Sequence, residues 1–366
     1  MLHHLLYPLR EYFTIFNVFK YITFRAAFAS ITAFLIIVIF APPIIRKLRH
    51  LKIGESVRNK ECPGLYDLHK NKQGTPTMGG ILILIGVFAS TILWADLNNM
   101  YLLLAMFVTL YLGALGFVDD YKKLMYAKTR KGSRGLNKRT KLFFQGLIGL
   151  AVALFLYWSP GNTKAIEFPF FKDFVVNLGI FYIPFVILII SACSNAVNIT
   201  DGLDGLAIGA IIMTAVTYTG MSYVTGHVKF AEYLGIYYLP EAAELTVFCS
   251  AIIGAGLGFL WYNSYPASIF MGDTGALALG GALGTVAVFI KKEMLLVIVG
   301  GIFVVEALSV LLQIISFRTT GRRIFKIAPL HHHFEKCGWP ESKVTIRFWI
   351  IAIILVFLSF STLKLR

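Results

Sequence analysis

Charged residues are scarce in this sequence. They make up 14% of its 366 residues, whereas 57% of the residues are hydrophobic and 31 are phenylalanine. Soluble domains carry about 25% charged residues. Several apolar runs approach or exceed the ~20 residues that a helix needs to cross a bilayer. They are too long and too weakly alternating for barrel strands. The composition therefore excludes a soluble enzyme and predicts an all-α integral membrane protein.

Other absences narrow the class further. The four cysteines have no CxxC spacing, so neither a disulfide framework nor a zinc site is indicated. The first long apolar run, 26–41, is followed by two prolines and positive charge rather than by a small-residue cleavage site, so we expect it to stay as the first helix. No linker, low-complexity tract or internal repeat divides the chain. We therefore expect one polytopic domain over residues 1–366.

What the sequence does contain is about ten apolar spans. They are expected near 24–43, 77–95, 100–118, 142–158, 175–193, 205–223, 245–262, 268–289, 295–316 and 346–363. With the N-terminus outside, three of the loops that face the cytoplasm carry 24 of the 34 lysines and arginines. The positive-inside rule then predicts that both termini are periplasmic.

This topology brings the polar clusters to one membrane face. Five segments that are far apart in the chain fall on the cytoplasmic side, and we expect the active site there. They are "HKNKQGTPTMGG" (69–80), "FVDDYKK" (117–123), "NAVNITDGLDG" (195–205), "NSYPASIFMGDTG" (263–275) and "APLHHHFEKCGW" (328–339).

Carboxylates dominate three of these segments. Asp119 and Asp120 follow a span directly, and neighbouring carboxylates need cations or a metal beside them. Such a pair suits Mg²⁺ ligation or proton removal at a phosphate site, although a lone pair of aspartates is more often a solvated helix end. Asp273 stands in the apolar stretch "FMGDTGAL", where a carboxylate is costly unless it is paired or bound to metal.

Asn198, Asp201 and Asp204 recur at a spacing of three. On a helix they would share one face, but aspartate is a poor helix former, so the stretch is alternatively a short break at the membrane boundary. Capping of the next helix by Asp204 would explain one of the acids and not the other. Gly202 leaves the backbone open to a ligand.

Basic and imidazole side chains suggest an anionic ligand. His69 and Lys72 precede a glycine pair at a helix start, a place that suits phosphate or sugar. Lys138 is within reach of the same ligand. His331 and His332 belong to a run of three histidines. Because adjacent side chains on a helix point in different directions, all three rarely bind one ion, and they instead suit phosphate contacts or proton relay. They have no zinc partners at a suitable spacing.

Glu306 lies inside the ninth span. An acid at such a depth is a functional candidate by default, but it would equally hold two helices together. The sequence leaves both readings open.

The acids indicate a divalent ion. The clustered basic residues indicate a ligand with several phosphates, and the apolar surroundings indicate a lipid. Together they favour Mg²⁺-assisted phosphoryl transfer between a nucleotide-activated compound and a lipid phosphate. A transporter would place its polar groups near the bilayer midplane, in repeats, and only Glu306 fits that description. A structural scaffold gives no reason for the acids.

The motifs "GTPTMGG", "FVDDYKK", "NAVNITDGLDGLA", "FMGDTGALALGG" and "APLHHHFEKCGW" resemble the signature segments of the polyprenyl-phosphate N-acetylhexosamine-1-phosphate transferases. The resemblance spans nearly the whole chain in the same motif order. "PTMGG" and "PLHHHFE" resemble the branch that acts on muramyl-pentapeptide.

This resemblance implies transfer of phospho-N-acetylmuramoyl-pentapeptide from UDP-MurNAc-pentapeptide to undecaprenyl phosphate, which forms lipid I and UMP for peptidoglycan synthesis in the bacterial cytoplasmic (inner) membrane. It also implies a Mg²⁺ requirement, a homodimer and inhibition by nucleoside antibiotics; no nucleic acid partner is expected. Transfer of GlcNAc-1-phosphate from UDP-GlcNAc is the alternative.

The resemblance also carries residue roles. Asp273 and Asp120 would bind Mg²⁺, Asp119 would bind or deprotonate the lipid phosphate, and His331 and His332 would contact the nucleotide sugar. The expected substrate-binding residues are His69, Lys72, Thr77, Lys138, Asn198, Asp201, Gly202, Asp204, Asn263 and Phe270. Direct attack by the lipid phosphate is the expected mechanism, and an aspartyl-phosphate intermediate is the alternative.

Overall fold

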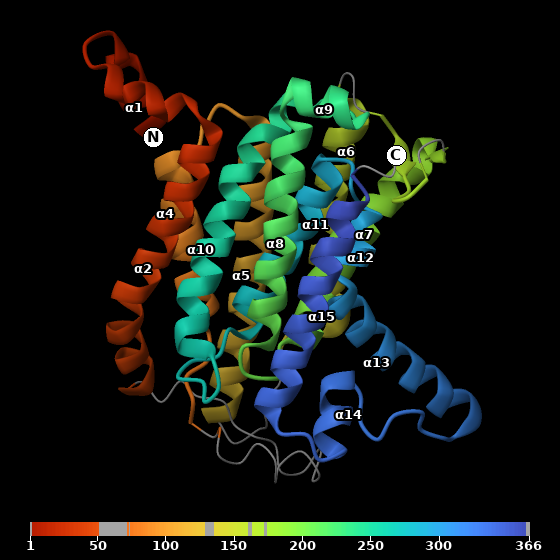
Figure 1. Ribbon diagram of the computed structural model, residues 1–366. Coiled ribbons are helices and arrows are strands. Elements are labelled where there is room, and N and C mark those ends of the chain that lie inside the picture. Colours follow the sequence, from red (N-terminus) through yellow and green to blue (C-terminus); the bar gives the residue numbers. More distant parts are fainter. Residues whose placement is uncertain are drawn as a thin grey trace.

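The protein forms a bundle of long helices in a computed structural model (Figure 1). The structure describes residues 2–50, 72, 74–128, 135–159, 163–171 and 174–363. Within these residues nine helices are long and apolar enough to cross a membrane, and the shorter apolar helix α4 packs among them. The ten elements of the bundle are α2 (Ile22–His50), α4 (Gly80–Trp94), α5 (Met100–Lys128), α6 (Lys138–Trp158), α7 (Tyr182–Thr200), α8 (Leu206–Thr225), α10 (Leu245–Asn263), α11 (Gly272–Phe289), α13 (Gly301–Thr320) and α15 (Glu341–Ser361).

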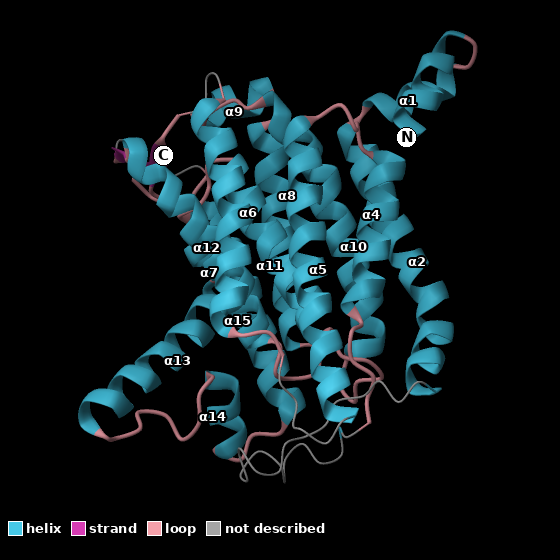
Figure 2. Cartoon of the chain, turned by 180° about the vertical axis from the view of Figure 1, so that it is seen from behind, coloured by secondary structure: helices cyan, strands magenta, loops and turns pink. Residues whose placement is uncertain are grey.

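Short elements precede the first long helix and connect the others, as the reverse view in Figure 2 also shows. The helical ones are α1 (Leu2–Leu6), η1 (Tyr7–Glu11), η2 (Thr14–Lys20), η4 (Gly179–Phe181), α9 (Val228–Leu234), η5 (Pro240–Glu244), α12 (Leu295–Val299) and α14 (Leu330–Lys336). A small antiparallel hairpin joins α6 to α7, and in it Ile166 of β1 (Ala165–Glu167) pairs with Val176 of β2 (Val175–Asn177).

The all-α membrane fold is confirmed, and each of the ten expected spans contains one long helix. Several boundaries were wrong. The span expected at 175–193 begins instead with β2, and α7 starts only at Tyr182. The span expected to end at residue 118 continues to Lys128. Asp119 and Asp120 therefore lie within a helix rather than after it.

The helix α2 also runs past the prolines at which the first span was expected to end. Proline at position 42 has no N–H to donate to the carbonyl of Val38, four residues earlier. Instead, the hydroxyl of Tyr262 on α10 donates to the Val38 carbonyl oxygen at 2.9 Å. Because a neighbouring helix satisfies this carbonyl, α2 continues to His50.

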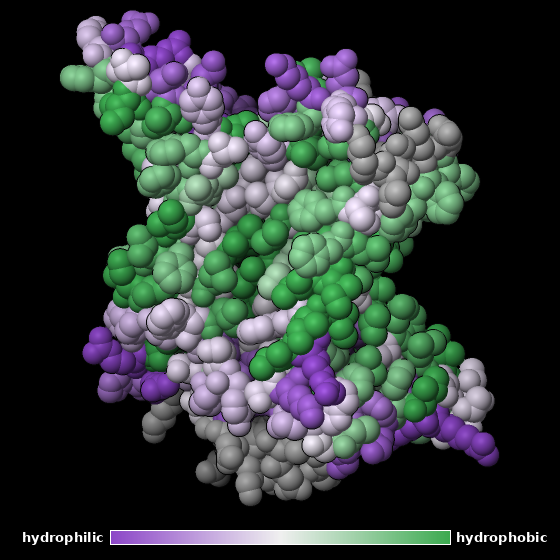
Figure 3. Space-filling view, in the orientation of Figure 1, coloured by the Kyte–Doolittle hydropathy of each residue, from purple (hydrophilic) through white to green (hydrophobic). Residues whose placement is uncertain are grey.

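The helix α11 is the centre of the bundle. Every residue from Asp273 to Phe289 is buried, and α11 packs against α4, α5, α7 and α8. By contrast, α13 leans away from the bundle (Figure 1) and is mostly exposed. A broad apolar band crosses the middle of the surface, and polar residues gather at both ends (Figure 3), as expected of a protein that spans a bilayer.

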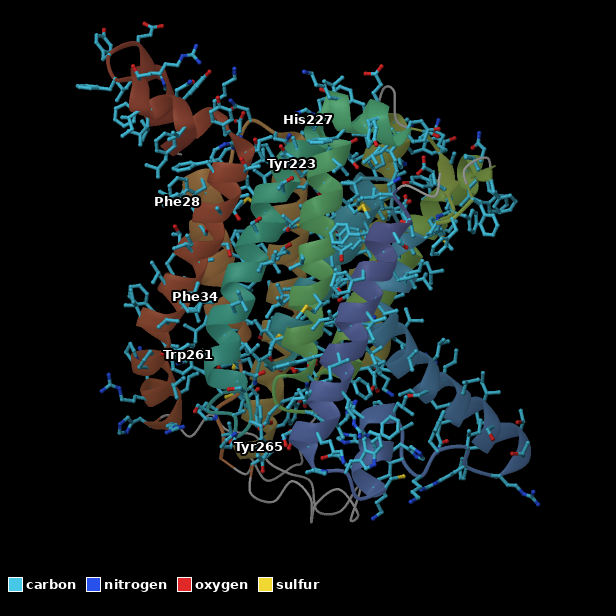
Figure 4. All side chains as sticks on the ribbon, viewed as in Figure 1. Phe28, Phe34, Tyr223, His227, Trp261 and Tyr265 are labelled. Carbon is cyan, nitrogen blue, oxygen red and sulfur yellow. The ribbon has the colours of Figure 1, made fainter. Side chains whose placement is uncertain are left out.

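Both termini lie at one end of the bundle (Figure 1). Tyr223 and His227 mark this end, and Tyr265 marks the opposite end (Figure 4). Ten crossings require both termini on the same side, as the sequence predicts. That this side is periplasmic stays a prediction from the positive-inside rule.

Close contact between α2 and α10 depends on Gly254. A Cβ atom at this position would lie 1.9 Å from the backbone oxygen of Ser30. Small residues let membrane helices approach in this way. Gly146 on α6 has room for a side chain, because a Cβ atom at this position would lie 4.0 Å from its nearest neighbour.

We predict that Gly254→Ala lowers the stability of the detergent-solubilised protein by about 1–3 kcal/mol, because α2 and α10 must move apart. The melting temperature measures this effect, and Gly146→Ala is the matched control with little change. Equal melting temperatures for the two variants would contradict the packing described here.

Candidate functional site

Three carboxylates and two lysines meet at the end of the bundle that is opposite to the termini. We call Asp119, Asp120, Asp273, Lys123 and Lys141 the acid–lysine cluster. The Lys123 Nζ atom lies 2.8 Å from both Asp119 Oδ2 and Asp273 Oδ1. The Lys141 Nζ atom lies 2.7 Å from Asp119 Oδ2 and 2.5 Å from Asp273 Oδ2. Each lysine therefore bridges acids from two helices.

Asp120 joins α5 to the start of α11. One of its carboxylate oxygens accepts hydrogen bonds from the Thr274 N–H at 2.9 Å and the Thr274 hydroxyl at 2.7 Å. The other accepts from the Asp273 N–H at 3.2 Å. These N–H groups have no partner within α11 itself. Asp120 therefore caps α11 from a neighbouring helix and fixes the position of Asp273.

The local sequence explains how these side chains meet. Lys123 follows Asp119 by four residues and Asp120 by three, so all three share one face of α5. Gly116, one turn before Asp119, lies against α11, where a Cβ atom would be 2.3 Å from the backbone oxygen of Asp273. Without a side chain at this point, the acids of α5 can reach the first turn of α11.

The cluster fits a divalent metal ion. Carboxylate oxygens of Asp119, Asp120 and Asp273 lie within 4.8 Å of one another. They are hard oxygen donors of the kind that Mg²⁺ prefers. Three carboxylates against two ammonium groups leave an excess of one negative charge, which favours a further cation.

A second polar cluster surrounds the turn between α7 and α8. Lys72 Nζ lies 2.6 Å from Asp204 Oδ1 and also forms an ion pair with Glu341. The N–H of Asp204 donates to Glu341 Oε1 at 2.7 Å. Burial alone would lower the pKa of Lys72, but attraction by Glu341 and Asp204 outweighs it, so the pKa is raised above its usual value. We call Lys72, Asp204 and Glu341 the turn cluster.

The turn itself is a break between helices. The helix α7 ends at Thr200, Asp201 is its C-cap, and α8 begins after Gly205, whose φ is +74°. The break expected at the membrane boundary is thus confirmed, and a single helix face for Asn198, Asp201 and Asp204 is wrong. Capping of α8 by Asp204 is also wrong, because its carboxylate accepts from Lys72 and from the Ala267 N–H.

The segment 263–271 connects the two clusters. Asn263 accepts from the Gly205 N–H at 3.1 Å and donates to the Ile269 carbonyl at 2.8 Å. The half-buried ring of Phe270 has its centroid 5.8 Å from Lys72 Nζ. Two residues further, a Cβ atom at Gly272 would lie 3.0 Å from Thr77 Oγ1 and 2.8 Å from Asp120 Oδ2. Thr77 is therefore next to the acids.

The histidines lie on α14, and each has a different partner. His331 Nδ1 lies 3.1 Å from Glu306 Oε2, and His332 Nδ1 lies 2.7 Å from Glu335 Oε2. His333 Nδ1 accepts from the backbone N–H of Lys326 at 3.1 Å. The expectation that these side chains point in different directions is confirmed. His331 is adjacent to the turn, because a Cβ atom at Gly202 would lie 2.3 Å from its Nε2.

Not every residue expected from the sequence takes part in the contacts described above. Asn198 lies half-buried near the end of α7, and Lys138 is exposed at the start of α6. His69 lies outside the described residues. Sequence reasoning missed Lys141 and Glu341. Lys141 lies one helical turn after Lys138 and could have been considered with it. Glu341 approaches Lys72 only in the folded protein, and no pattern in the nearby sequence indicates this contact.

Comparison with known proteins identifies the class of protein to which this chain belongs. Residues 99–291 match the family model of Glycosyl transferase family 4. This range includes all three acids of the acid–lysine cluster. The molecule is thus a membrane-embedded transferase of that class.

A narrower assignment follows from full-length relatives. Residues 72–84 match a phospho-N-acetylmuramoyl-pentapeptide-transferase signature. Proteins of that name from Citrifermentans bemidjiense and Pelobacter propionicus are 53% and 52% identical to this chain over 366 residues. A third, from Thermodesulfovibrio yellowstonii, is 51% identical over 369 residues. Each alignment covers 100% of both chains.

The chain belongs to the phospho-N-acetylmuramoyl-pentapeptide-transferase family. This membership confirms the resemblance that the motifs indicate, including its muramyl-pentapeptide branch. Together with the helices, it identifies a multi-pass protein of the bacterial inner membrane.

We predict that Lys141→Gln lowers transfer activity by about 10- to 100-fold, because residues that hold ligating carboxylates in place usually contribute this much. Lys138→Gln, at the exposed start of the same helix, should have a smaller effect. Steady-state release of the nucleotide product measures both. A greater loss for Lys138→Gln would show that Lys141 is not the lysine that matters.

Proposed function

We propose that this protein transfers phospho-N-acetylmuramoyl-pentapeptide from UDP-MurNAc-pentapeptide to undecaprenyl phosphate, with lipid I and UMP as products. The observation that carries the proposal is the meeting of the acid–lysine cluster and the turn cluster at one end of an apolar bundle. A site with an excess acid and several cations suits a metal-bound pyrophosphate. The surrounding bilayer supplies the lipid acceptor.

We assign each part of the site a role. Asp273 and Asp120 hold Mg²⁺, which when bound offsets the negative charge of the pyrophosphate. Lys123 and Lys141 hold the acids in place and add positive charge beside the phosphate oxygens. Asp119 faces the lipid phosphate. The nucleotide-binding residues are Lys72, Thr77, Asn198, Asp201, Gly202, Asp204, Asn263 and Phe270, with His331 and His332 at the nucleotide sugar; His69 and Lys138 stay predicted contacts.

The reaction is a single in-line displacement. An oxygen of the lipid phosphate attacks the β-phosphorus of the nucleotide. A new P–O bond forms while the bond from the β-phosphorus to the bridging oxygen breaks. UMP leaves with that oxygen and its electron pair. The lysines of the site balance the charge of the attacking and leaving oxygens, as at other phosphoryl-transfer sites.

The proposal predicts that purified protein moves label from the muramyl-pentapeptide nucleotide into lipid, but only with both Mg²⁺ and polyprenyl phosphate present. Chelation by EDTA should stop the reaction and added Mg²⁺ should restore it. Asp273→Asn should lower turnover by about 100-fold or more, since a metal contributes several kcal/mol.

A substrate panel separates the alternatives. Labelled lipid from UDP-GlcNAc instead of the muramyl nucleotide would assign GlcNAc-1-phosphate transfer. Nucleotide-dependent flux across proteoliposomes without UMP release would identify a transporter. The homodimer and the inhibition by nucleoside antibiotics are part of the same proposal, and sedimentation in detergent and competition with the nucleotide test them.

A single displacement also predicts that no UMP is released before the lipid acceptor is added. Rapid-quench measurement of UMP with stoichiometric enzyme checks this, and Asp119→Asn provides the comparison. A stoichiometric burst in the wild-type protein that is missing from the variant would contradict direct attack and establish an aspartyl-phosphate intermediate.

A further inference from the structure

Glu306 is a carboxylate inside a largely lipid-exposed helix, yet its side chain is fully buried. An acid at this place is costly unless donors surround it. Three donors do so. The N–H groups of Leu330 and His331 donate to the two carboxylate oxygens at 2.9 and 3.1 Å, and the imidazole Nδ1 of His331 lies 3.1 Å from Oε2. All of them come from the start of α14.

The partner of Glu306 is the histidine nearest to the turn cluster. His331 is fully buried, and its Nε2 atom has no hydrogen-bond partner among the described residues. This Nε2 lies against Gly202, in the turn that separates α7 from α8. Since a carboxylate only accepts, Nδ1 carries the shared proton, and Nε2 is the nitrogen left for a ligand.

The two neighbouring histidines make contacts of another kind. His332 is paired with Glu335 of its own helix, and His333 accepts from a backbone N–H. His331 is thus the histidine whose ring contacts the buried acid of α13.

We propose that Glu306 is a positioning residue for His331. It fixes the proton on Nδ1 and aims Nε2 at the turn that carries Asp201 and Asp204. The inference rests on the proposed function, because that function supplies the ligand of Nε2, a nucleoside diphosphate sugar. It gives the buried acid a role in turnover, in addition to holding α13 against α14.

The competing reading is that Glu306 only caps α14. The N-cap residue of α14 is Pro329, whose side chain offers no cap, so the N–H groups of the first turn need an outside acceptor. Glu306→Gln tests the difference. The amide retains one oxygen for these N–H groups, but it has no negative charge for the imidazole.

The decisive experiment is a double-mutant cycle with Glu306→Gln and His331→Asn. We expect Glu306→Gln to lower kcat by about 10- to 100-fold, since carboxylates that orient an imidazole usually contribute this much. The KM of the nucleotide should stay within about threefold, because binding contacts elsewhere are intact. In the His331→Asn protein, the same change should alter kcat by less than about twofold.

Ser309→Ala is the matched control. Its hydroxyl is buried on α13 and donates to the backbone carbonyl of Glu306, so it probes the same turn through a hydrogen bond within α13. Turnover of this variant should match that of wild type. Losses that multiply in the double variant, or unchanged turnover in Glu306→Gln, would overturn the proposal.

A measurement without substrate separates this inference from the proposed function. In protein labelled with ¹⁵N-histidine, the His331 ring signals are identified by their loss in His331→Asn. We expect them to shift in Glu306→Gln and not in Ser309→Ala. If the ring signals respond but no muramyl transfer occurs, the pair stands and the proposed function fails. If transfer occurs but the ring signals do not respond, the positioning role is wrong.

Discussion

A carboxylate at the edge of a bilayer must be neutralised where it lies, and the architecture of this protein follows from that constraint. Asp119 lies on α5 and Asp273 on α11, and their carboxylates would repel each other at this point. Lys123 and Lys141 bridge them within 2.8 Å, and Gly116 allows the close approach. Without these ammonium groups, α5 and α11 could not bring three acids together in so buried a place.

Charge balance separates this cluster from two other buried ion pairs. Near the termini, Arg25 binds Glu244 through two contacts of 2.6 Å, and Lys292 pairs with Glu167 at 2.6 Å. In each of these contacts one basic side chain meets one carboxylate, as in a structural pair. The acid–lysine cluster has an additional carboxylate. This excess, together with the convergence of three carboxylates within 4.8 Å, makes it a site for a cation.

The sequence predicted the spans well because a bilayer imposes a fixed apolar length, and it predicted the acids because charge is conspicuous in apolar surroundings. It could not predict boundaries that depend on neighbours. The helix α2 passes its prolines because Tyr262 comes from α10. Likewise, Lys72 and Glu341 are 269 residues apart, so no local pattern links them. Family resemblance identified residue types but not these partners.

The helix α13 has an exposed apolar side and a buried acid, Glu306, on its other side. On α13, Leu308, Leu311 and Leu312 are exposed, whereas the acid two residues before Leu308 is buried against α14. An exposed apolar stripe favours contact with acyl chains. The acid on the other side fixes an imidazole beside the turn cluster. One face of α13 is therefore suited to lipid while the other supports the polar site, and the buried carboxylate is tolerated because donors of α14 surround it.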